Sequence, residues 1–318
     1  NDYGCHPFTL QLAKSLAQKK HIVNYMFPTY LQNPIANFKD YSSCKNLFIN
    51  PIQIKGTYNK YNFFLRRKQE IEYGNISWKK IKNIKAKVLI CVTVPLDALR
   101  ILVEEAKNIE IPLIFWVQDI YSEAIKKILL KKFFLLSGII SWYYSKIENY
   151  CIQNSSKIIF ITHKFKKYFK NLNYSKYIVI ENWGVLQNKI KNNLKHKWKK
   201  RLKLENEFIF LYAGTLSYKH DSQLFFKLSE NFKDSKVIIF SEGKFAEILK
   251  KKSKNHKNLI VKNWVNYNEL QSIFSLADVL LVSLSKDAGE FSVPSKILSY
   301  FYSGKPILGM IPKQNLAY

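Results

Sequence analysis

Short apolar segments alternate with helix-like stretches along almost the whole chain, and this alternation constrains the fold more than any other feature. In stretches such as 8–20, 96–106 and 141–154, apolar residues recur every three or four positions. Buried strands that alternate with helices form parallel sheets covered on both faces. We therefore predict an α/β fold. The predicted strands are 21–25, 87–94, 112–118, 157–162 and 177–181 in the first half, and 208–212, 236–240, 258–261, 278–283 and 306–311 in the second.

A polar, lysine-rich stretch separates two such blocks. We predict a first domain over 1–183, a basic connector over 184–206 and a second domain over 207–318. Doubly wound domains bind ligands beyond the carboxyl ends of their strands, so we expect an interdomain cleft. The chain opens like the turn after a strand and stops just after a strand. We therefore expect its first strand and a C-terminal part to be missing.

The net charge of +28 suggests a nucleic-acid partner, but the kind of basic residue argues against it. Among the 51 basic residues only Arg66, Arg67, Arg100 and Arg201 are arginine, the residue that reads bases through its bidentate fork. No nucleic-acid partner is predicted. The charge is +16 over 1–183, +7 over 184–206 and +5 over 207–318, a distribution that suits a first half facing anionic lipid.

One segment of the first domain has the composition of a helix that lies on a membrane surface. Lysines 126, 127, 131 and 132 flank the apolar residues 128–130, and 133–144 is apolar and aromatic. A helix packed inside the domain is the alternative. The longest apolar run, 133–145, is too short to cross a bilayer, and four scattered cysteines suggest reduced thiols. We expect a cytoplasmic protein, peripheral on the inner face of the cytoplasmic membrane.

Residues suited to phosphate binding follow several predicted strands. Gly4 precedes a helix, where a glycine lets backbone N–H groups approach a phosphate. Gln118 and Asp119 end a strand of the first domain. In the second domain Gly214 follows a strand, and Lys219 stands before the next helix, placed to offset phosphate charge.

The segment 287–296 carries the most specific pattern. Pro294 and Ser295 fit the start of a helix, with Ser295 as its cap. Lys296 then stands at the positive end of the helix dipole, which is unfavourable unless an anion binds there. We predict a diphosphate at this position, with Glu290 accepting hydrogen bonds from sugar hydroxyls.

Several common motifs are missing from the sequence. It contains no Asp-x-Asp, no GxxxxGK[ST] and no GxGxxG, and its six histidines have no metal-ligand spacing. Metal-dependent transferases with one domain, ATPases and dehydrogenases are therefore disfavoured. We expect no metal and no cofactor.

Taken in order, these segments resemble glycosyltransferase family four, whose fold is GT-B, with two Rossmann-like domains. The likeness is greatest to its colanic-acid and O-antigen branch of fucosyl- and N-acetylfucosaminyl-transferases. The segments that carry it are DYGCHPFTLQLAKSLA from Asp2, TVPLDA from Thr93, FWVQDIYSEAI from Phe115, IENWGVL from Ile180, FLYAGTLSYKHD from Phe210 and DAGEFSVPSKILSYFYSGKPIL from Asp287.

The resemblance implies that the second domain holds the nucleotide-sugar and the first domain holds the acceptor. Three of the donor-facing residues, Asp119, Lys219 and Glu290, are the candidate catalytic residues. Many relatives carry arginine at Thr215 and a ribose-binding glutamate at Ser299, so this sequence lacks one phosphate partner and one ribose contact of those relatives. The donor-binding residues implied are Gly4, Gln118, Gly214, Thr215, Glu242, Gly243, Trp264, Val265, Phe291, Ser292, Val293, Pro294, Ser295, Lys296 and Ser299.

The expected function is that of a retaining, metal-independent hexosyltransferase. It would move a sugar from a nucleotide-sugar, its substrate rather than a cofactor, to an envelope polysaccharide or lipid-linked oligosaccharide. Lys219 and helix N-termini would stabilise the leaving diphosphate. The alternatives are a sugar-nucleotide epimerase of the same fold, an inactive scaffold of an envelope-glycan assembly complex, and a lysine-rich nucleic-acid binder. The last should show clustered arginines or a reading helix.

Overall fold

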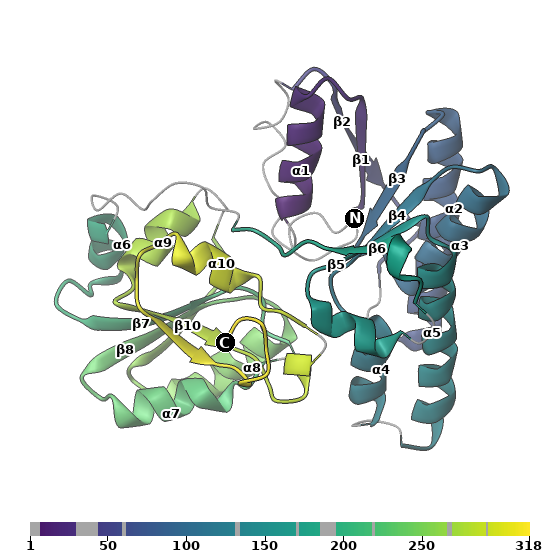
Figure 1. Cartoon of the computed structure of the whole chain (residues 1–318). Coiled ribbons are helices and arrows are strands. Elements are labelled where there is room, and N and C mark those ends of the chain that lie inside the picture. Colours follow the sequence, from purple (N-terminus) through teal and green to yellow (C-terminus); the bar gives the residue numbers. More distant parts are fainter. Residues whose placement is uncertain are drawn as a thin grey trace. The chain divides into compact units, whose positions relative to one another are not determined.

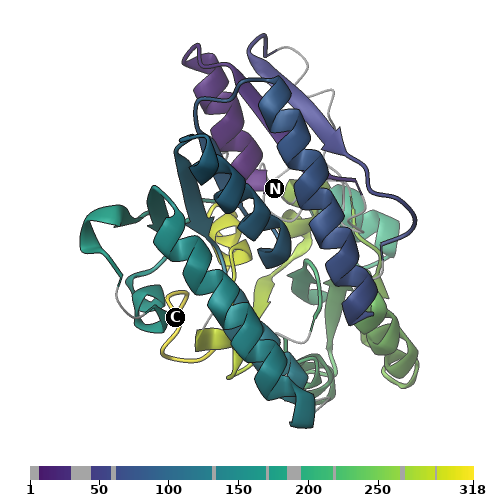
Figure 2. The same cartoon turned by 90° about the vertical axis from the view of Figure 1, so that its right-hand side faces the viewer.

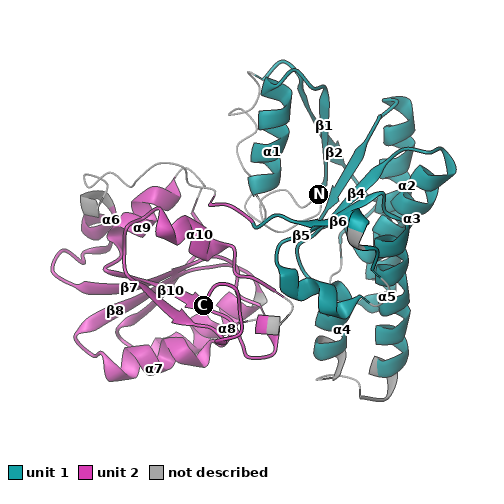
Figure 3. Ribbon diagram, viewed as in Figure 1, with its two compact units in different colours: residues 1–181 teal, residues 182–318 magenta. Residues whose placement is uncertain are grey.

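The chain forms two compact α/β units, residues 1–181 and 182–318 (Figures 1 and 3). The structure is a computed structural model that describes residues 7–29, 44–58, 62–130, 134–169, 172–184, 195–217, 220–265, 269–290 and 292–318. Each unit is built on parallel strands. The predicted α/β class is therefore confirmed.

Unit 1 holds two groups of parallel strands. The larger sheet has the order β3 (Leu89–Val92), β4 (Leu113–Val117), β5 (Lys157–Phe160) and β6 (Tyr177–Val179). The smaller pairs β1 (Val23–Pro28) with β2 (Leu47–Ile52). Helix α1 (Pro7–Gln18) packs on this pair, burying Leu10, Ala13 and Ala17 against Tyr25 and Phe27.

Long helices cover the larger sheet of unit 1. Helices α2 (Phe63–Asn83), α3 (Leu96–Asn108) and α5 (Phe134–Asn154) lie side by side (Figure 2), and α4 (Tyr121–Leu130) packs along α5. Two short 3-10 helices, η2 (His163–Tyr168) and η3 (Tyr174–Lys176), connect β5 to β6. No helix in the described part of the chain is long and apolar enough to span a membrane.

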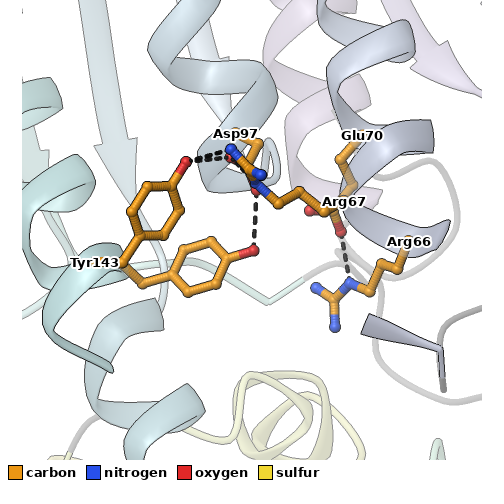
Figure 4. A network of polar contacts seen from close by, with 6 residues as sticks. Arg66, Arg67, Glu70, Asp97 and Tyr143 are labelled. Atoms are coloured by element: carbon orange, nitrogen blue, oxygen red, sulfur yellow. Dashed lines mark hydrogen bonds and ion pairs between the residues drawn. The ribbon is translucent and has the colours of Figure 1, made fainter. Parts of the chain in front are cut away.

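A polar network ties α2, α3 and α5 together (Figure 4). Arg67 donates from Nε to Asp97 at 3.3 Å and from Nη2 to the Tyr143 hydroxyl at 2.7 Å. The neighbouring residue on α2, Arg66, donates from Nε to Glu70, one turn further along the same helix, at 2.6 Å. Burial raises the pKa of the Glu70 carboxyl, and Arg66 opposes that shift. Arg67 therefore joins α2 to α3 and α5, while Arg66 compensates the buried Glu70 carboxylate within α2.

Unit 2 is a five-stranded parallel sheet in the order β11 (Ile307–Met310), β10 (Val279–Ser283), β7 (Phe208–Ala213), β8 (Ser235–Phe240) and β9 (Leu259–Lys262). Its helices are α6 (Lys195–Leu202), α7 (Gln223–Asn231), α8 (Lys244–Lys252), α9 (Leu270–Leu276) and α10 (Lys296–Phe301). Two 3-10 helices complete it, η5 (Ser253–Asn255) and η7 (Ala288–Glu290).

The pleat of β7 explains why this sheet is covered on both faces. Ile209 and Leu211 point into a core shared with α6, α9 and α10, while Phe210 and Tyr212 point into a core shared with α7 and α8. Successive side chains of a strand alternate between faces. A continuous apolar run such as 208–213 therefore needs a helical layer on each side.

The predicted strands are all present, with ends shifted by a few residues, but β2, α2 and α6 were not predicted. Strand β2 contains Asn50 and Pro51, residues that are depleted in strands. Helix α2 turns Gln69, Glu70 and Ser77 inward. Its buried face is partly polar, so apolar periodicity alone does not reveal it. The range expected as a connector also contains a helix, α6, whose Trp198 packs in the core of unit 2.

Candidate functional site

The candidate donor residues of unit 2 lie in the turns that follow its parallel strands. Gly214 follows β7, Glu242 and Gly243 follow β8, and Trp264 and Val265 follow β9. The loop that contains Glu290 and Ser292 follows β10. Parallel strands place these turns at one edge of the sheet, which is where doubly wound folds bind ligands.

Gly214 and Lys296 are brought together at the centre of this edge. Gly214 has φ +141°, and a Cβ there would lie 2.9 Å from the Lys296 Nζ. The Lys296 ammonium sits over the Tyr212 ring, 3.6 Å from its centroid. The turn after β7 therefore needs glycine for its backbone angle and for the space that the lysine occupies.

The Lys296 ammonium has no hydrogen-bond partner within the described residues. Its Nζ is buried, although other parts of the residue reach solvent. Burial lowers the pKa of Lys296 to about 7. Contact with the Tyr212 ring compensates some of the lost hydration, but a buried ammonium without an anion is unfavourable. The position therefore suits an anionic ligand, which would raise that pKa again.

The surrounding turns are fixed by hydrogen bonds. The Gly214 N–H donates to the Phe240 carbonyl at 3.0 Å, and the Leu216 N–H donates to the Ser241 hydroxyl at 3.2 Å. On α10, the Tyr300 hydroxyl accepts from the Ala213 N–H at 3.2 Å. These bonds fix the strand end beside Lys296.

Glu242 and Trp264, expected near the nucleotide base, are also in contact. The Trp264 N–H donates to Glu242 Oε1 at 3.2 Å. Gly243, with φ +93°, begins helix α8, and Val265 is partly buried. The carboxylate of Glu242 therefore joins the turns after β8 and β9.

The loop before α10 differs from expectation at its end. Ser295 has helical backbone angles and makes no side-chain cap, so the predicted capping role is wrong. Ser292 and Pro294 are buried, and Val293 is partly buried. A residue already in the helical region cannot present its hydroxyl to the first free N–H groups as an extended cap does.

The remaining predicted residues fall into three groups. In unit 1, Gln118 is buried and Asp119 partly buried, directly after β4. In unit 2, Thr215 is exposed and its carbonyl accepts from the Tyr212 hydroxyl at 3.0 Å, while Ser299 is partly exposed on α10. Gly4, Lys219 and Phe291 lie outside the described residues, and Glu290 ends η7.

Glu148 is a buried carboxylate that sequence reasoning missed, and it contacts residues that follow Asp119 in the sequence. From α5 it accepts from the Tyr121 N–H at 2.8 Å, the Ser122 N–H at 3.1 Å and the Ser122 hydroxyl at 2.5 Å. It thereby caps α4 directly after the Gln118–Asp119 turn. Burial raises the pKa of Glu148 to about 7, despite these bonds. Because Glu148 contacts Ser122, 26 residues earlier in the sequence, no short sequence pattern reveals this cap.

Comparison with solved structures finds folds of the same kind. HepE from Anabaena, in complex with UDP-glucose, matches with a TM-score of 0.68 and 12% identity, over 97% of this chain and 77% of HepE. WaaG, a glycosyltransferase involved in lipopolysaccharide biosynthesis, matches with a TM-score of 0.66 and 14% identity, over 97% of this chain and 78% of WaaG. Sucrose-phosphate synthase from Thermosynechococcus elongatus matches with a TM-score of 0.65 and 12% identity, over 97% of this chain and 77% of the synthase.

These likenesses confirm the predicted GT-B fold class. No protein-family model and no curated protein sequence matches the chain.

Proposed function

We propose that the chain transfers a sugar from a nucleotide-sugar, whose diphosphate binds beside Lys296 and Gly214. The observation that carries the proposal is the buried Lys296 ammonium, which has no hydrogen-bond partner in the described residues and lies at the ligand edge of the sheet. HepE of the same fold was solved with UDP-glucose. A diphosphate would supply the missing anion through charge-assisted hydrogen bonds.

We propose that the neighbouring turns bind the donor's other parts. Glu242, Gly243, Trp264 and Val265 would border the base, and the loop 290–295 would hold the sugar. Asp119, Lys219 and Glu290 remain the proposed catalytic residues, and Gly4 and Gln118 remain proposed donor-binding residues. We propose a retaining, metal-independent hexosyl transfer, in which positive groups stabilise the departing diphosphate.

The proposed acceptor is an envelope polysaccharide or lipid-linked oligosaccharide, and the proposed relationship is to the branch of fucosyl- and N-acetylfucosaminyl-transferases. Both rest on the sequence motifs. An epimerase of the same fold would convert a nucleotide-sugar without any acceptor. Product analysis with and without acceptor separates the two, and the anomeric configuration of the product tests retention.

Replacing Lys296 by methionine tests the donor site. The change removes a buried, unpartnered charge, so the free protein should melt at a higher temperature, while a bound diphosphate would lose an interaction of about 1.5–3 kcal/mol. UDP, GDP and ADP are screened by thermal shift, and the nucleotide that stabilises the wild type should bind Lys296→Met about 10–100-fold more weakly.

Lys199→Met is the matched control. Lys199 is also buried, but its Nζ donates to the Glu207 carbonyl at 3.0 Å and lies 4.0 Å from Asp278. Its loss should lower the melting temperature and leave nucleotide affinity unchanged. If none of the three nucleotides stabilises the wild type, or Lys296→Met binds one as well as the wild type does, the donor site is wrong.

We further propose that α4 and α5 bind the inner face of the cytoplasmic membrane. Ile139 and Trp142 on α5 are 68% and 63% exposed, and Lys146 stacks on Trp142. Lys126 on α4 is more than half exposed. Exposed apolar side chains beside lysines are typical of an interfacial segment. Lys131 and Lys132 of the predicted segment lie outside the described residues.

Sedimentation with vesicles tests this surface. Changing Lys126, Lys127, Lys131 and Lys132 to glutamate should abolish binding to phosphatidylglycerol vesicles, since each such lysine contributes about 1 kcal/mol. Changing the four exposed lysines of unit 2, Lys250, Lys251, Lys252 and Lys254, to glutamate alters the net charge equally. This variant should retain most of the vesicle binding. Equal effects of the two variants would assign the attraction to net charge rather than to α4 and α5.

A further inference from the structure

The Asn315 side chain, from the segment after β11, holds the loop between β10 and α10. Within the loop, the N–H groups of Ala288 and Gly289 each donate to the Ser285 carbonyl at 3.1 Å, and the Ser292 N–H donates to the Ala288 carbonyl at 3.1 Å. The carbonyls of Gly289 and Ser292 instead accept hydrogen bonds from the Asn315 Nδ2, each at 2.8 Å.

Asn315 is itself held rigidly. It is 5% exposed, its N–H donates to the Pro312 carbonyl at 2.9 Å, and its Oδ1 accepts from the Ala317 N–H at 3.0 Å. Pro312 also closes over the loop, since a Cβ on Gly289 would lie 2.4 Å from the Pro312 Cγ. The segment after β11 is therefore shaped to hold the loop at Gly289 and Ser292.

The two carbonyls that Asn315 holds bracket Glu290 in the sequence, and Lys296 follows four residues after Ser292. Lys296 is held by a different part of the unit, against Tyr212 and Gly214. The loop and the ammonium thus have separate supports. Loss of the Asn315 bonds would release the loop and leave the ammonium in place.

We propose that Asn315 is a positioning residue that fixes the 288–292 loop for recognition of the donor's sugar, apart from recognition of its diphosphate. This inference rests on the proposed function. A loop held within about 0.5 Å by such supporting bonds is what a specific contact needs. Asn315→Ala should leave the affinity for the nucleoside diphosphate within twofold of wild type, yet weaken the nucleotide-sugar about tenfold.

The test uses the full chain and calorimetric titration. UDP, GDP and ADP identify the nucleotide that binds wild type, and its fucose, N-acetylfucosamine, glucose, galactose and N-acetylglucosamine derivatives identify the sugar that gains most affinity over the nucleotide alone. Asn315→Ala should lose that gain. If it keeps the gain, or loses nucleotide and nucleotide-sugar equally, the positioning role is overturned.

Asn258→Ala is the matched control. The Asn258 Nδ2 also bridges two carbonyls of unit 2, those of Ser229 at 2.7 Å and Phe232 at 3.1 Å, at the end of α7. Asn258→Ala should lower the stability by a similar amount. It should keep the additional affinity that the sugar gives over the nucleotide alone. A loss of that gain in Asn258→Ala would mean that general destabilisation, not loop position, explains the effect.

Hydrogen exchange gives a reading that does not depend on donor binding. In Asn315→Ala the amides of Ala288 to Ser292 should exchange at least tenfold faster, while those of β7 and β8 are unchanged. Unchanged exchange of the loop would overturn the inference. Faster exchange in a chain that binds no nucleotide would uphold the fastening by Asn315 and refute the proposed function.

Discussion

At Gly214 both the backbone angle and the space beside it call for glycine. In Gly214→Ala the new methyl group meets the Lys296 Nζ at 2.9 Å and Cε at 3.3 Å, and the flexible lysine end gives way more easily than backbone would. We expect the strained φ of +141° to cost about 1–3 kcal/mol of folding free energy. Displacement of the ammonium should also weaken nucleotide binding, which urea unfolding and nucleotide titration measure separately.

The control for this substitution is Gly304→Ala. Gly304 also has a positive φ, +65°, but a Cβ there meets no atom within 4 Å. Gly304→Ala should lower the unfolding free energy by about 1 kcal/mol, because alanine is strained in the left-handed backbone conformation. Its nucleotide affinity should equal that of the wild type. Unchanged nucleotide affinity in Gly214→Ala would contradict the close approach of the lysine to this turn.

Gly214 and Lys296 could be predicted from the sequence because each belongs to a short local pattern. Gly214 is a glycine after a strand, and Lys296 is a lysine at the start of a helix. Sequence reasoning did not reach Tyr212 beneath the ammonium, because a buried aromatic on a strand reads as core. It assigned Ser295 as a cap from residue type alone, whereas capping depends on backbone angles. Asn315 escaped notice because its partners, Gly289 and Ser292, lie more than twenty residues away.

Between elements, Glu148 joins α5 to the start of α4 and makes stability depend on pH. Its folded-state pKa, about 7, lies above the unfolded value near 4.5, so the native state binds the proton more tightly. The stabilisation is complete below about pH 4.5 and is lost as the pH rises through 7. The shift corresponds to about 3 kcal/mol, at about 1.4 kcal/mol per pKa unit.

Glu148→Gln cannot ionise, so its unfolding free energy should lack this decline between pH 5 and pH 8, as measured by urea unfolding at several pH values. The variant should also lose one of the two acceptor oxygens that cap α4. Glu104→Gln, on a half-exposed part of α3, should retain the wild-type decline. A decline of equal size in Glu148→Gln would assign the pH dependence to other groups.

The elements that the sequence predicted best are the strands whose two faces both pack against apolar side chains. The strands of unit 2 read as apolar runs because both faces are covered, and all five were found. Helix α2 was missed because Arg66, Arg67 and their carboxylate partners replace apolar contacts with a polar network. Such networks depend on partners from α3 and α5, which no window of sequence reveals.

For the whole molecule, the separate cores of the two units predict separate responses to nucleotide. Unit 2 has its own apolar cores on both faces of its sheet, and the proposed contacts of the diphosphate, Gly214 and Lys296, belong to that unit. A ligand that binds only the folded state adds about 2.7 kcal/mol at a concentration 100 times its dissociation constant. Native-state exchange of the most protected amides in β7, β8 and β10 should then slow about hundredfold, while β4 and β5 of unit 1 stay unchanged. Lys296→Met should abolish the slowing. Equal slowing in both units would show either that they unfold together or that the nucleotide binds unit 1 as well.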